Sequence, residues 1–159
     1  MRRIFLFLVL LGSLMMVREV RADAPAPARG KVMKVLPLLL NRQGQDALSP
    51  SLFDRDAYQK YLRLHTNEIS AVRYDVQWKA SGTADARVKI RVELRAIAPD
   101  GSPVLMNLEA PAAKTGWWGR WTTLLLAGED YQKMRHVVAW RATLWAGDQL
   151  LGEQKSFLW

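Results

Sequence analysis

The chain has 159 residues, 50% of them hydrophobic, and contains no cysteine. This length and composition fit one folded domain, and the missing cysteine excludes disulfide bonds, thiol catalysis and thiolate metal sites. The formal net charge is +8, but the basic residues alternate with apolar ones along predicted strands, as on a solvated sheet face. We therefore do not expect nucleic acid as a partner.

Residues 1–22 have the pattern of a secretory signal peptide. Arg2 and Arg3 precede an apolar run from Ile4 to Val17, which is shorter than the roughly 20 residues of a membrane-spanning helix. Small side chains favour cleavage after Ala22, whereas the charged residues just before that site leave an uncleaved anchor as the alternative. We expect an exported protein, periplasmic or extracellular, with no stable transmembrane span after cleavage.

A spacer rich in Ala and Pro follows at residues 23–30, and it lacks the large apolar side chains that a core needs. The folded domain is expected over residues 31–159. Its first strand is predicted in KVMKVLPLLLN, where Pro37 cannot donate a ladder hydrogen bond and so indicates an edge strand or a bulge. The following NRQGQ predicts a turn.

One short helix is predicted near Asp54 to Leu64. Ser49, which precedes Pro50, or Asp54 itself can cap its N-terminus. Aromatic and apolar side chains, including Tyr58 and Tyr61, then repeat at helical spacing. We expect this aromatic stripe to pack over one end or edge of a sheet.

The rest of the chain alternates apolar and charged side chains with a period of two residues. This alternation predicts antiparallel strands with one solvated side in AVRYDVQWKA and RVKIRVELRAI. The turn sequence PDGS leads from the second of them into PVLMNLEA. The predicted inward residues are Val72, Tyr74, Val76 and Trp78 in the first strand and Val88, Ile90, Val92 and Leu94 in the second.

A hairpin is predicted at the C-terminal end of the chain. VVAWRATLWA and QLLGEQKSFLW flank Gly147, which suits a two-residue type II′ turn. That turn sets Leu144 opposite Leu151 and Val138 opposite Phe157.

The predicted hairpin register contains one conflict, because Glu153 and Lys155 fall on its apolar face. Either a bulge near Gly152 switches the alternation, or this face is only partly covered. The chain thus has about seven strands, one short helix and a crossing loop, AGEDYQKMRH, in which Tyr131 is similar to the corner tyrosine of sandwich folds. This pattern predicts an all-β, antiparallel, immunoglobulin-like or fibronectin-like β-sandwich, with a small closed barrel as the alternative.

Three segments carry a resemblance that covers most of the mature chain. LSPSLFDRDAYQKYLR, YDVQWKA and VVAWRATLWAGDQLLGEQKSFLW resemble a family of short exported bacterial proteins of uncharacterised activity. The resemblance implies export and a single domain, and it implies no catalytic residue.

Tryptophan is concentrated in TGWWGRWTTLLLAG. In a strand, Trp117 and Trp121 point one way and Trp118 the other. The first interpretation is that Trp118 or Trp121 fills the core while another tryptophan covers its rim. The alternative is a carbohydrate-binding or partner-binding surface that these three form with Arg120. Trp145, beside the hairpin tip, is the other candidate for an exposed tryptophan.

Catalytic signatures are missing from the sequence. It contains no GxSxG, HExxH, Walker or Rossmann motif. Its two histidines, His65 at the helix end and His136 at a strand start, are assigned structural or solvent-facing roles, and Asp54 and Asp56 are assigned to helix capping. We expect no enzyme, metal or cofactor, but a binding or structural accessory of the bacterial cell envelope, with an envelope protein or a polysaccharide as partner.

Overall fold

The computed structural model describes residues 27–83, 87–112, 120–134 and 136–159. Within these residues the chain forms seven strands in two antiparallel sheets, as the sequence predicts. The predicted signal peptide lies outside the described residues, and so do Trp117 and Trp118.

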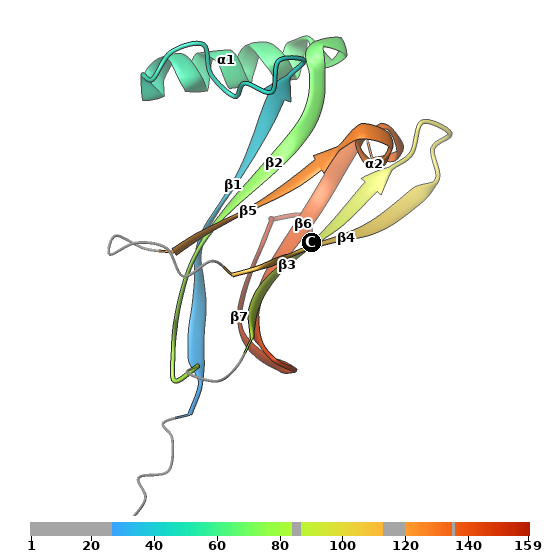
Figure 1. Ribbon diagram of the computed structural model, residues 1–159. Helices are drawn as coiled ribbons and strands as arrows, with labels where there is room; N and C mark the ends of the chain where they lie inside the picture. Colours follow the sequence, from blue (N-terminus) through green and yellow to red (C-terminus); the bar gives the residue numbers. More distant parts are fainter. Residues whose placement is uncertain (1–26, 84–86, 113–119, 135) are drawn as a thin grey trace, which may run out of the picture.

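The two sheets face one another, and α1 lies across the far end of β1 and β2 (Figure 1). The first sheet has the order β1-β2-β5 and the second the order β4-β3-β6-β7. The first contains β1 (Arg29–Asn41), β2 (Ile69–Ser81) and β5 (Arg120–Ala127). The second contains β3 (Val88–Ile97), β4 (Pro103–Pro111), β6 (His136–Ala146) and β7 (Gln149–Lys155). The helices are α1 (Leu52–Leu64), α2 (Gly128–Lys133) and the short 3-10 helix η1 (Thr66–Glu68).

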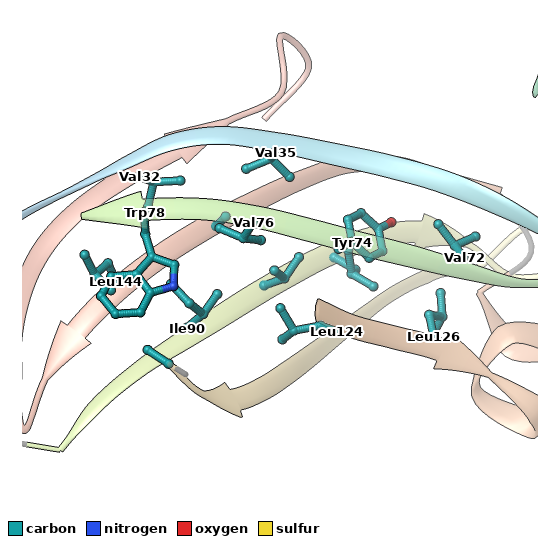
Figure 2. Packing of buried hydrophobic residues seen from close by; sticks show 14 of the residues in the cluster. Val32, Val35, Val72, Tyr74, Val76, Trp78, Ile90, Leu124, Leu126 and Leu144 are labelled. Atoms are coloured by element: carbon teal, nitrogen blue, oxygen red, sulfur yellow. The ribbon is translucent and has the colours of Figure 1, made fainter. Parts of the chain in front are cut away.

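The core forms where the inward faces of the two sheets meet (Figure 2). All eight residues predicted to point inward from β2 and β3 are buried, because period-two alternation places them on one face of each strand. Trp78 is the largest buried side chain of the core, and its indole Nε1 donates a hydrogen bond of 3.0 Å to Thr122 Oγ1. Burial of an indole N–H is tolerated because it has this partner.

Trp121 does not fill the core, and Trp118, the other residue of that interpretation, lies outside the described residues. Thr122 and Leu124 are the inward residues of β5, so Trp121 lies on the outer face with 37% of its surface exposed. The core position is held by Trp78, whose ring lies 5.0 Å from the Arg120 guanidinium.

Strand β1 is an edge strand, as Pro37 predicts. It begins at Arg29, two residues before the expected start, and its bulge lies at Met33, between Val32 and Lys34, and not at Pro37.

The C-terminal hairpin confirms the two-residue turn at Gly147, whose φ is +56°. The predicted bulge is also present, because Leu144 pairs with Gly152 and Leu151 is the extra residue. The predicted register is wrong beyond it: β7 ends at Lys155, and Phe157 is fully exposed and not paired with Val138.

Both helices differ from the sequence predictions. Helix α1 begins at Leu52 and not at Asp54, because Ser51 is its N-cap and accepts a hydrogen bond of 3.4 Å from the Asp54 N–H. Ser49 instead donates to the Asp54 carboxylate over 2.6 Å. The predicted crossing loop contains α2, in which Tyr131 is buried.

Candidate functional site

A cleft of about 630 Å³ separates the two sheets at the end of the molecule nearest α1. One wall is formed by β1 and β2 and the other by β6, and α2 and η1 each contribute a residue. Figure 1 shows how it arises: β1 and β2 extend toward α1 and diverge from β6. The core between the sheets is therefore closed at one end and open at the other.

Apolar side chains form most of both walls. Leu39 and Val72 line the first wall, and Val137 and Trp140 line the second. Val138, at the rim of the second wall, is 44% exposed. These side chains continue the inward faces that elsewhere bury each other, so the cleft is an uncovered extension of the core.

Tyr74 contributes a buried polar group to the cleft lining. Its side chain is only 1% exposed, and burial raises the pKa of its phenol above the ordinary value. A phenol hydroxyl can both donate and accept a hydrogen bond, so Tyr74 can offer one to a polar group of a bound molecule.

Two basic side chains lie at the mouth of the cleft. Arg63 comes from the last turn of α1 and His136 from the first position of β6, and both are exposed. No aspartate or glutamate is among the described residues that line the cleft. The mouth therefore favours an anionic group over a cationic one.

Gln59 of α1 fixes the position of the first wall. Its amide accepts a hydrogen bond of 2.8 Å from the Leu39 N–H and donates one of 2.8 Å to the Leu39 carbonyl, as a neighbouring strand would. The same amide nitrogen donates to the Asp46 carbonyl over 2.9 Å. Helix α1 therefore holds the free edge of β1 through the buried side chain of Gln59, and Tyr58 adds a hydrogen bond from the Asn41 amide.

The structure does not bring the described members of the predicted tryptophan surface together. Trp121 lies on the outer face of the three-stranded sheet. Trp145 is half-buried on the other sheet, where its Nε1 donates to Thr143 and the Arg91 guanidinium lies 5.5 Å from its ring. Arg120 lies over Trp78, as described above.

The outer face of the four-stranded sheet carries cations over aromatic rings, a feature the sequence analysis missed. Arg95 and Arg141 lie 4.0 and 5.0 Å from the ring of Trp159. Arg141 is paired with Glu93. Glu109 is paired with Arg91 and Lys89, and these hydrogen bonds lower the pKa of its carboxyl. Since most of these charges already have partners, this face is less suited to a ligand than the cleft.

The two histidines lie in different settings. His65 stacks on Tyr61 with 4.0 Å between ring centroids, and its Nδ1 lies 2.9 Å from the Tyr61 carbonyl oxygen. His136 is at the cleft mouth. In the part of the chain that the structure describes, no three His, Asp or Glu residues are grouped so that they could hold a metal ion. The described helices are too short or too polar to span a membrane.

No family model matches the chain, and neither a curated protein nor a solved structure matches it. The site is therefore argued from its geometry. Sequence analysis assigned Tyr74 to the core and gave His136 a structural or solvent-facing role, and it did not single out Arg63. No local pattern in the sequence marks the cleft, because it depends on where the facing strands stop.

Proposed function

We propose that the protein is an exported, non-catalytic binding protein of the bacterial cell envelope, and that its ligand occupies the cleft between the sheets. The observation that carries this proposal is the cleft itself, whose volume of about 630 Å³ lies within the range of about 300–1,000 Å³ of known ligand sites. Such sites combine apolar walls with a few polar groups that orient the ligand. Here those groups are Tyr74, Arg63 and His136.

Leaving this end of the core open has an energetic cost. Exposed apolar surface is unfavourable by about 25 cal/mol per Å², and longer side chains on either wall would fill the space. Leu39 on the first wall and Val137 on the second instead leave the space between them open. A bound molecule with an apolar body would cover both walls, which supports a binding role over a purely structural one.

A carbohydrate-binding module that uses Trp117, Trp118 and Trp121 is the second candidate. It is favoured by the exposed outer position of Trp121, on the same strand face as exposed Leu125. Arg120, which this surface would also need, is already held over the Trp78 ring.

The strand order supports an immunoglobulin-like assignment, which we also propose. When the seven strands are lettered A to G, A-B-E lie in one sheet and C-F-G in the other, as in constant-type domains. The difference is that β4 pairs with β3 and not with β5. Export is supported by the apolar run and the small residues before the spacer.

The test of the binding site is titration with 8-anilinonaphthalene-1-sulfonate, a fluorescent probe with an apolar body and one negative charge. We expect saturable binding by the full mature chain. Val138→Glu places a negative charge at the cleft rim, which repels the sulfonate and disrupts the apolar wall, and should weaken binding by at least about tenfold.

The matched control is Leu125→Glu, the same change at an exposed strand position outside the cleft. It should bind the probe within about twofold of the unchanged protein. Urea unfolding checks that both variants fold. Equal binding by the two variants, or no saturable binding, would overturn the assignment of the cleft.

A further inference from the structure

One edge of β6 is open inside the cleft. Strand β7 pairs with Arg141–Ala146, and Ser156 extends this contact to Trp140 by donating its N–H to the Trp140 carbonyl over 2.9 Å. Beyond Trp140, no described strand lies beside residues 136–139 on that edge. An unpaired strand edge is a template onto which another extended chain can add.

The facing edge of β1 does not offer the same opportunity. Pro37 has no N–H to donate, and Gln59 already satisfies both backbone groups of Leu39. The two edges that border the cleft therefore differ, and β6 is the one available for pairing. Because Gln59 mimics a neighbouring strand, it also prevents β1 from recruiting one.

The cleft dimensions and lining suit a short extended segment. Tyr74 lies five positions after Ile69 along the cleft wall. At the rise of a β-strand these five steps span about 17 Å. Apolar walls would receive every second side chain of the segment, and the Tyr74 hydroxyl would meet one of its backbone polar groups. At the mouth, Arg63 and His136 face no described acidic residue in the lining.

We propose that the cleft binds an extended peptide segment of a partner protein, added as a strand along residues 136–139 of β6. The segment has alternating apolar side chains and an acidic group beside Arg63 and His136. This inference rests on the proposed function, because it names the occupant of the same cleft. An added strand would give hydrogen-bond partners to the backbone groups on the open edge of β6, whereas an acyl chain would leave them unpaired.

The test is selection from a random hexapeptide library displayed on phage, with the full mature chain as target. Enriched peptides should show apolar residues at alternate positions and an acidic residue near one end. A synthetic copy with alternate backbone nitrogens methylated should bind at least about tenfold more weakly, because N-methylation removes the ladder donors and leaves the side chains unchanged.

Charge recognition is tested with Arg63→Glu, which should weaken binding of the enriched peptide by about tenfold or more. Its matched control is Lys60→Glu, the same reversal at an exposed position of α1 that does not line the cleft. Lack of enrichment, or binding that ignores N-methylation, overturns the peptide proposal. Tight binding of dodecanoate in place of any peptide also overturns it. If the naphthalene probe still distinguishes Val138→Glu from Leu125→Glu, the binding function survives and only the peptide inference fails.

Discussion

Tyr74 shows how a single side chain can serve both the fold and the cleft. Its side chain belongs to the core cluster that contains Val76 and Leu124, and the same residue lines the cleft. Burial disfavours the charged phenolate, and this raises its pKa. Loss of the phenol proton is therefore less favourable in the folded chain than in the unfolded chain.

The raised pKa of Tyr74 predicts how stability depends on pH. Below about pH 10 the phenol is neutral in both states, and its contribution to stability is fully present. As the pH rises further, the unfolded chain releases this proton while the folded chain retains it, so the free energy of unfolding falls by up to about 1.4 kcal/mol per pH unit. Tyr74→Phe removes this contribution, and urea unfolding between about pH 9 and 11 measures the change in slope. Equal slopes for the two proteins would contradict the prediction.

Prediction from sequence succeeded at residues whose environment follows from strand alternation. Trp78 is buried because it shares a face with Val76, a regularity that is local and visible in YDVQWKA. Trp121 was assigned to the core as one alternative because tryptophan is large and apolar. Which face of β5 it occupies, however, depends on where that strand begins. Residue type alone does not determine that register.

At the scale of elements, the approach of β7 to β1 closes one side of the sandwich. The bulge at Leu151 places Gly152 against β1, where an added Cβ would lie 3.0 Å from Lys31 Cα and 3.1 Å from the Gly30 carbonyl oxygen. These contacts are with backbone, which cannot move as a flexible side chain does. The missing side chain of Gly152 therefore permits the two edges to meet.

Gly152→Ala should destabilise the protein by about 1–3 kcal/mol, because β7 and β1 must separate to admit the methyl group. The sign is informative: at an unstrained position, the same change usually stabilises by about 0.4–1 kcal/mol. Urea unfolding measures the effect, with Glu153→Ala at the next, exposed position as the control, expected within about 0.5 kcal/mol of the unchanged protein. A stabilised Gly152→Ala variant would show that the edges do not meet as described.

The cleft could not be predicted from the elements taken one at a time. Alternation predicted which residues of β2 and β6 point inward, but whether those faces are covered depends on where the partner strands stop. Strand β7 ends at Lys155, although the composition of the following SFLW would allow the strand to continue along β6. Trp159, held by Arg95 and Arg141 on the outer face, stabilises that departure through contacts between distant parts of the chain.

Across the whole molecule, packing is uneven from one end to the other. The closed end contains Trp78, Ile90 and Leu144, each at most 1% exposed. The other end contains the cleft, with α1 attached to β1 mainly through Gln59 and its neighbours. Local opening requires less free energy where fewer apolar contacts must break.

This asymmetry predicts a gradient of amide hydrogen exchange within single strands. Amides of residues 76–78 in β2 and 90–94 in β3 should exchange only through global unfolding, whereas those of residues 136–139 in β6 should exchange at least about a hundredfold faster. Exchange followed by mass spectrometry of peptic fragments, or residue by residue by NMR, measures the difference. Saturation with an enriched hexapeptide should slow exchange at residues 136–139 and leave residues 90–94 unchanged, because an added strand supplies partners to the open edge alone. Uniform protection along β6 without peptide would show that its edge is already paired and that the open cleft is not part of the folded state.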